Sequence, residues 1–220
     1  MVIVDTHVHV GLKKYATVEE LLKQMERSKV DKAVLVQYRA GLEPIGNTDN
    51  TYISECARKY PQRLAAVGIV DWTKDDATEK LEYWVKEKEI QGIRLDGMAV
   101  SPGPDKYVIW EKAAELGINI SVYGKLDRLA EIAERFPSLN LHIEHNGMPS
   151  INGDSVLNLA KYSNVSVKFS VTGLREISNQ PYPYKDTHSF LKLIYDRFGS
   201  KRIVWGSDYP PCQEHEGYDK

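Results

Sequence analysis

The chain has little cysteine, no long apolar run and almost no excess of charge of either sign. Only Cys56 and Cys212 occur among 220 residues, too few for a disulfide framework. No stretch approaches the roughly 20 apolar residues that span a bilayer. The N-terminus also lacks the charged region and the small-residue cleavage site of a signal peptide. We therefore expect a cytoplasmic protein that has no membrane segment.

The near balance of charge also limits the class of partner. Lys and Arg total 29 and Asp and Glu total 31, which gives a formal net charge of -2. A protein that clamps phosphate backbones needs a basic surface, so nucleic-acid binding is not expected. Hydrophobic residues make up 42% of the chain, which excludes wholesale disorder. Because no low-complexity linker divides it, we expect a single domain over residues 1–220.

Apolar, β-rich runs alternate with helical patterns from one end of the chain to the other. The predicted strands are Val2–Val8, Lys32–Tyr38, Leu64–Val70, Gly92–Leu95, Ile118–Gly124, Leu139–Glu144, Val165–Val171 and Arg202–Asp208. Every gap is long enough for the helical crossover that parallel strands need. One such helix is marked by apolar residues at helical spacing behind a Thr17-x-x-Glu20 capping box. The pattern predicts an α/β fold of the (β/α)₈ barrel type, with a doubly wound open sheet as the alternative.

The end of the chain departs from a regular barrel. Only Tyr209–Lys220 follow the eighth predicted strand, and they carry no apolar helical stripe. We therefore expect a barrel that lacks its final closing helix. An uncovered seam exposes apolar surface, which predicts self-association into a homo-oligomer.

Two predicted strands carry polar residues on one face. Ser121 and Tyr123 alternate with apolar residues in the fifth strand, and Ser166, Lys168 and Ser170 do so in the seventh. The apolar faces are expected to pack on helices, so the polar faces line the barrel interior and its mouth. An active site is a reason for polar residues there, and Tyr123, Lys168 and Ser170 are predicted to contact the substrate.

Asp5, His7 and His9 share one face of the first predicted strand. Two imidazoles side by side at a strand end suit Zn²⁺ or a similar divalent ion. The alternative is that both histidines satisfy neighbouring polar groups without a metal. Asp208 closes the eighth strand, where a barrel enzyme places its catalytic groups. It is a candidate general base or metal ligand, and the alternative is a loop cap.

Charged residues on two further strands are ambiguous. Arg94 lies opposite the apolar face of the fourth strand, where a guanidinium can bind a substrate carboxylate or polarise a carbonyl. The alternative is a structural partner for Asp5 or Asp96, because buried charges are usually paired. Lys168 has the same two interpretations.

The sixth strand offers two candidate histidines. Strict alternation places His142 and Glu144 on the interior face and leaves His145 just past the strand end. The pattern alone does not decide which histidine enters the site.

Three motifs together resemble the amidohydrolase superfamily, and more narrowly the amidohydrolase-2 type. They are Asp5-Thr6-His7-Val8-His9, His145-Asn146-Gly147-Met148-Pro149 and Gly206-Ser207-Asp208-Tyr209-Pro210. The strand Gly92-Ile93-Arg94 and the segment from Asn164 to Ser170 are similar to the branch that contains sugar lactonases and pyrone-dicarboxylate lactonase. The likeness runs from residue 2 to about residue 211.

The resemblance implies a distorted barrel with its site at the C-terminal strand ends. It implies His7, His9 and Asp208 as metal ligands. Together with the strand positions of Asp208 and Arg94, it makes Asp208, His145 and Arg94 the predicted catalytic residues. It favours His145 over His142. Metal-dependent members usually supply a histidine from the fifth strand, and this chain has none there. Two alternatives therefore stay open. The site binds a divalent metal, with Zn²⁺ the first candidate, or it works by the metal-independent mechanism that some members of the lactonase branch use.

The leading hypothesis is therefore a hydrolase that opens a small, anionic lactone or cyclic ester with water activated by Asp208. One alternative is metal-dependent, non-oxidative decarboxylation of a small aromatic or enoic acid. The other is a catalytically inert barrel that binds a ligand.

Overall fold

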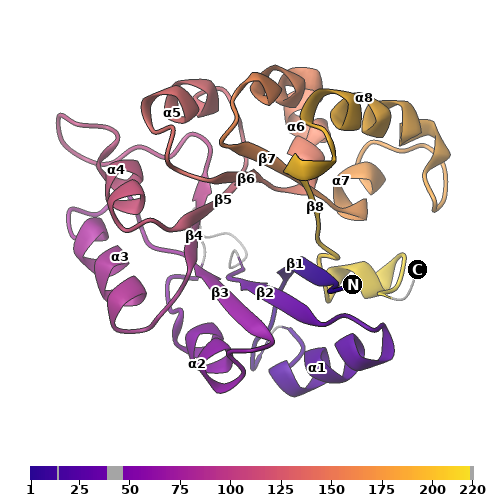
Figure 1. Ribbon diagram of the computed structural model, residues 1–220, viewed down its shortest axis with the longest axis horizontal. Helices are drawn as coiled ribbons and strands as arrows, with labels where there is room; N and C mark the ends of the chain where they lie inside the picture. The colour runs from indigo at the N-terminus through magenta and orange to yellow at the C-terminus, as the bar shows by residue number, and fades with distance from the viewer. Residues whose placement is uncertain (14, 39–46, 219–220) are drawn as a thin grey trace.

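A computed structural model describes residues 1–13, 15–38 and 47–218. These residues form eight parallel strands that follow one another around the sheet in chain order (Figure 1). The strands are β1 (Val4–Val8), β2 (Lys32–Val36), β3 (Leu64–Gly68), β4 (Gly92–Asp96), β5 (Asn119–Tyr123), β6 (Leu141–Ile143), β7 (Val165–Phe169) and β8 (Ile203–Trp205). Each predicted strand is confirmed, usually a few residues shorter than its apolar run.

Helices lie outside the ring of strands in every gap (Figure 1). They are α1 (Val18–Arg27), α2 (Thr51–Lys59), α3 (Ala77–Lys86), α4 (Val108–Glu115), α5 (Leu129–Arg135), α6 (Pro149–Asn152), α7 (Val171–Arg175) and α8 (His188–Phe198). The predicted capping box at the start of α1 is confirmed, since Thr17 and Glu20 bond each other's backbone N–H groups. None of the helices in the described part of the chain is long and apolar enough to cross a membrane.

β1 and β8 meet at a seam instead of pairing along their length. A single bridge joins Val8 to Tyr209, which lies beyond β8. Near the mouth, His9 N donates to Tyr209 O at 2.7 Å and Asp208 N donates to His7 O at 2.9 Å. The barrel is therefore nearly closed and the open-sheet alternative is wrong.

A short C-terminal segment, residues 209–218, occupies the place of a closing helix. After β8 the described chain contains a 3₁₀ turn, Pro211–Glu214, and no α-helix. Cys212 and Tyr218 of this segment are buried. At the start of β1, however, Val2, Ile3 and Val4 stay exposed. The seam is thus only partly covered, and self-association remains a prediction.

The predicted polar faces do point into the barrel, where they form layers. In the layer nearest the N-terminal strand ends, His142 lies between Ser166 Oγ at 2.6 Å and Asn119 Oδ1 at 3.3 Å. The next layer contains Ser121 and Lys168, and the mouth lies beyond it. Polar side chains bonded to one another can fill a barrel interior without the cost of unsatisfied groups.

Candidate active site

The C-terminal end of β1 brings two histidines together. His7 Nε2 and His9 Nε2 lie 3.2 Å apart, and both side chains are nearly fully buried. His9 Nδ1 lies 2.6 Å from Val36 O. Because a carbonyl only accepts hydrogen bonds, Nδ1 carries the proton and His9 Nε2 presents a lone pair. A hydrogen bond of this kind fixes the ring and the tautomer of a metal ligand.

Asp208 approaches the same point from the end of β8. Its Oδ1 lies 3.3 Å from His9 Nε2 and 3.8 Å from His7 Nε2. The backbone of Asp208 has φ 60°, the left-handed conformation that costs energy in residues other than glycine and clusters at functional sites. Gly206 makes this approach possible, because a Cβ there would come within 2.6 Å of the His7 Cβ.

The three donor atoms fit a metal ion. Around a tetrahedral Zn²⁺ with bonds of about 2.0–2.1 Å, neighbouring ligand atoms lie roughly 3.3 Å apart. The separations among His7 Nε2, His9 Nε2 and Asp208 Oδ1 are 3.2, 3.3 and 3.8 Å. A second group of candidate ligands, His7, Glu144 and His145, shares His7 with the first. The His7 Nδ1 on that side is buried and has no hydrogen-bond partner among the described residues.

The local pKa values suit metal ligation as well. Burial lowers the pKa of His7 well below its ordinary value, which keeps the imidazole neutral. Burial alone would raise the pKa of Asp208. The close approach of His9 and the neighbouring imidazoles of His145 and His7 outweigh that effect and hold the pKa below its ordinary value. Metal ions bind neutral imidazole and ionised carboxylate.

Arg94 forms a buried ion pair with Glu144. Its Nε donates to Glu144 Oε1 at 2.9 Å, and its Nη2 donates to Glu144 Oε2 at 2.6 Å. Arg94 is therefore paired with a buried carboxylate, as the structural interpretation of this residue predicts. The carboxylate is that of Glu144 and not that of Asp5 or Asp96. Asp5 Oδ1 instead accepts from the backbone N of His7 and of Ser207, and Asp96 Oδ1 accepts from Met98 N. The guanidinium also lies over the Tyr123 ring, 4.9 Å from its centroid.

Lys168 joins this ion pair from β7, the strand next to β6. Its Nζ donates to Ser121 Oγ at 2.6 Å, and Ser121 Oγ donates to Glu144 Oε1 at 2.7 Å. Burial lowers the pKa of Lys168 to about 8. Glu144 thus balances two cations, which explains why a fully buried carboxylate keeps a pKa well below its ordinary value despite desolvation.

His145, rather than His142, lies at the mouth. The His145 and His7 ring centroids are 4.8 Å apart. Ser170, predicted to contact substrate, has its Oγ 2.8 Å from His145 Nδ1 and so orients the imidazole. His142 is held in the lower layer by Ser166 and Asn119, and burial lowers its pKa to about 4.

Three residues at the site escaped the sequence-based prediction. Glu144 shares the inward face with His142, a signal that alternation already contained. Thr172 donates its hydroxyl to Asp208 Oδ2 at 2.7 Å. The only sequence signal for this contact is the position of Thr172 shortly after the seventh strand. Tyr15 stacks on His9 with ring centroids 5.4 Å apart, which no local pattern indicated. Burial first, and then the Asp208 charge, raises the pKa of Tyr15.

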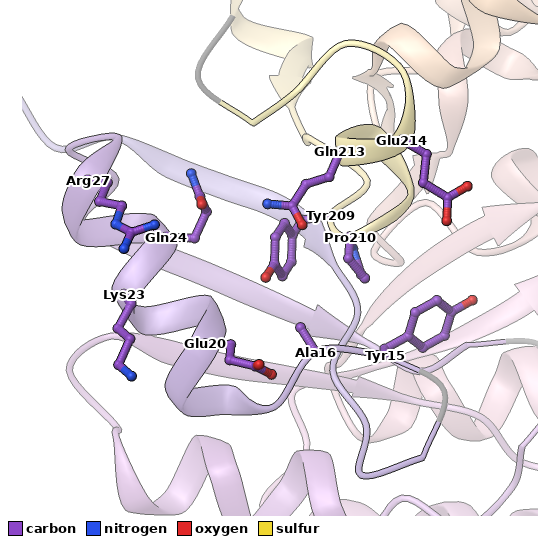
Figure 2. A pocket seen from close by; sticks show the side chains of 10 residues that line it. All are labelled: Tyr15, Ala16, Glu20, Lys23, Gln24, Arg27, Tyr209, Pro210, Gln213 and Glu214. Atoms are coloured by element: carbon purple, nitrogen blue, oxygen red, sulfur yellow. The ribbon is translucent and has the colours of Figure 1, made fainter.

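A groove of about 650 Å³ lies beside the site, outside the ring of strands. Figure 2 shows its two walls, α1 with Glu20, Lys23 and Gln24, and the C-terminal segment with Gln213. Tyr15 at one end of the groove is also the residue that stacks on His9. None of the candidate metal ligands lines the groove.

Comparison with known proteins places the chain in a family. The model of the amidohydrolase family Amidohydro_2 matches residues 4–220. L-fucono-1,5-lactonase of Burkholderia ambifaria is 26% identical over 214 residues, which cover 87% of this chain and 69% of that protein.

Two solved structures share the fold. A protein of Pseudomonas putida assigned as a 2-pyrone-4,6-dicarboxylic acid hydrolase has a TM-score of 0.71 at 21% identity, covering 95% of this chain and 83% of that one. An amidohydrolase of Burkholderia multivorans with bound zinc has a TM-score of 0.73 at 20% identity, covering 100% of this chain and 88% of that one. The family match spans nearly the whole chain, strand ends and site residues included, and the chain belongs to the amidohydrolase family.

Proposed function

We propose that the protein hydrolyses a small, anionic lactone or related cyclic ester at the mouth of the barrel. The observation that carries the proposal is the triangle of His7 Nε2, His9 Nε2 and Asp208 Oδ1, gathered from both sides of the seam. The similarity to L-fucono-1,5-lactonase supports the choice of a lactone as substrate class. Arg94 and Lys168 nearby supply the positive charge that favours an anionic substrate.

His7, His9 and Asp208 would hold a divalent ion, and two nitrogens with one oxygen are a donor set that suits Zn²⁺. Such an ion supplies Lewis acidity toward the carbonyl oxygen of the substrate. The chain's own residues move the proton. Asp208 accepts a proton from the attacking water as the new C–O bond forms. It returns that proton to the ring oxygen when the ester bond breaks.

The developing negative charge on the carbonyl oxygen needs fixed positive partners. We assign this role to His145 and Arg94. Ser170 orients the imidazole and Glu144 orients the guanidinium, so neither group has to reorganise during the reaction. Tyr123 and Lys168 belong to the same wall of the barrel and are proposed to contact the substrate.

A lactone panel read with a pH indicator tests the proposal, because hydrolysis releases acid. Turnover of at least one sugar lactone or pyrone dicarboxylate is expected, and Asp208→Asn is expected to lower kcat/KM by roughly 10²–10⁴-fold. Asp196→Asn is a matched control, because Asp196 pairs with Lys192 on the exposed face of α8. Full turnover by Asp208→Asn contradicts the assignment.

Elemental analysis of the same preparation separates the proposed reaction from its alternatives. Zinc that is retained by the wild type and lost from His7→Ala and His9→Ala supports the metal site. Release of CO₂ from an aromatic acid, without lactone turnover, replaces lactone hydrolysis with the decarboxylase alternative. An active protein without metal points to the metal-independent mechanism.

A further inference from the structure

The two oxygens of Asp208 have different partners. Oδ1 faces His7 and His9, whereas Oδ2 accepts the hydroxyl of Thr172 at 2.7 Å. A carboxylate that is bonded on one oxygen cannot rotate freely about its Cβ–Cγ bond. Thr172 therefore sets which oxygen Asp208 presents to the two imidazoles.

Thr172 belongs to α7, a helix of only five residues that follows β7. A helix so short has little stability of its own and must be held by its surroundings. On one side it rests on the backbone next to β6, since a Cβ at Gly173 would come within 2.2 Å of His145 O. Its position is thus coupled to the segment that carries His145 as well as to Asp208.

The C-terminal segment holds α7 from the other side. Arg175 lies one turn after Thr172, and its Nη1 is 2.9 Å from both Oε1 and Oε2 of Glu216. Tyr184 donates its hydroxyl to the same carboxylate. The Glu216 side chain is only 2% exposed and that of Arg175 is 24% exposed, so this contact is a partly buried ion pair rather than a chance surface pairing.

We propose that Thr172 is a positioning residue for Asp208, and that Glu216 acts through Arg175 to keep Thr172 in place. The C-terminal segment is then a working part of the active site, although it contributes no group to the reaction. This inference rests on the proposed role of Asp208 as a ligand. Partners in the outer shell of a metal ligand typically change metal affinity by 10–100-fold.

Zn²⁺ affinity, measured by competition with a chromophoric chelator, tests the role of Thr172. Thr172→Val keeps the shape of the side chain but removes the hydroxyl, and it is expected to weaken Zn²⁺ binding 10–100-fold. Thr172→Ser restores the donor and is expected to stay within about threefold of the wild type. A purely structural role would not respond to the hydroxyl in this way. Thr172→Ala serves as a second deletion if the valine variant does not fold.

Thr73→Val is the matched control. Thr73 also donates its hydroxyl to an aspartate, Asp71 Oδ1 at 2.6 Å, but on an exposed loop. The Zn²⁺ affinity of the Thr73→Val variant is expected to equal that of the wild type. If Thr172→Val binds Zn²⁺ as the wild type does while Asp208→Asn loses it, the inference fails and the proposed metal site stands. If Asp208→Asn binds Zn²⁺ unchanged, the metal site fails and the inference falls with it.

A double-mutant cycle tests the route through Arg175. Glu216→Gln alone is expected to weaken Zn²⁺ binding several-fold, because it releases α7. In the Thr172→Val background the same substitution is expected to have almost no further effect, since residues that act as one unit are not additive. Strictly additive losses of affinity would show that Glu216 does not act through Thr172, and would overturn that part of the inference.

Discussion

Arg94 and Glu144 meet across the barrel interior through two hydrogen bonds, Nε to Oε1 at 2.9 Å and Nη2 to Oε2 at 2.6 Å. β4 supplies the arginine, and the glutamate directly follows β6. Glu144 is fully buried, and Ser121 links it to Lys168 as well. One carboxylate thus compensates two cations that would otherwise lie uncompensated inside the barrel.

Removing the Glu144 charge is expected to destabilise the fold. Glu144→Gln leaves Arg94 and Lys168 without their counter-ion, which costs about 3 kcal/mol of the free energy of unfolding. The double variant Arg94→Met with Glu144→Gln is expected to recover part of that loss, since one buried cation is gone. Urea unfolding measures both. A loss below about 1 kcal/mol in the single variant contradicts the prediction.

Substitution of His145, which follows β6, and of His142, which lies within β6, is expected to have different effects. His145→Asn removes an imidazole at the mouth and is expected to lower kcat/KM by at least about 10²-fold. His142→Asn alters the lower layer, where the imidazole bonds Ser166 and Asn119, and is expected to change stability but leave kcat/KM within about threefold. Steady-state kinetics on the best lactone compares them. A larger kinetic effect at His142 would reverse the assignment.

The lowered pKa of Lys168 predicts that the free energy of unfolding depends on pH. Burial, with Arg94 nearby, lowers its pKa to about 8 in the folded protein, against 10.5 for the ordinary group. Between these values the unfolded chain binds more protons, so the free energy of unfolding rises with pH through this window. The whole effect is on the order of 3 kcal/mol. Below about pH 8 both states are protonated and this contribution is flat.

Lys168→Met isolates that contribution, because the thiol and phenol groups titrate in both proteins alike. Denaturant unfolding from pH 7.5 to 10.5 is expected to show a more positive slope for the wild type than for the variant. Parallel curves would mean that Lys168 keeps an ordinary pKa in the folded state.

Both cysteines are expected to resist thiol reagents in the native protein. Cys56 and Cys212 are unpaired and buried, and burial raises their pKa values to about 11 and about 12. The reactive species is the thiolate, which is scarce at neutral pH under these conditions. Ellman's reagent is expected to react with neither thiol before unfolding and with both afterwards. Rapid reaction of Cys212 would show that the C-terminal segment opens in solution.

Much of the fold follows from the sequence alone. The alternation of apolar runs with helical stripes locates every strand, because each β/α unit buries its apolar face in the same way wherever it lies in the chain. The polar faces of β5 and β7 likewise predict an interior lined with polar groups. Short-range periodicity also places His7 and His9 on one side of β1, since side chains alternate at every residue.

The tertiary structure alone decides which of these groups meet. Arg94 and Glu144 are 50 residues apart, and His9 and Asp208 lie at opposite ends of the chain. Only closure of the barrel brings β8 against β1 and turns separate motifs into one candidate metal site. Alternation along the strand does not decide whether His142 or His145 enters the site. The backbone turns after Glu144, beyond the end of β6, and this turn places His145 at the mouth. The C-terminal segment shows the same limit, because the burial of Glu216 and its pairing with Arg175 depend on long-range packing that no local pattern encodes.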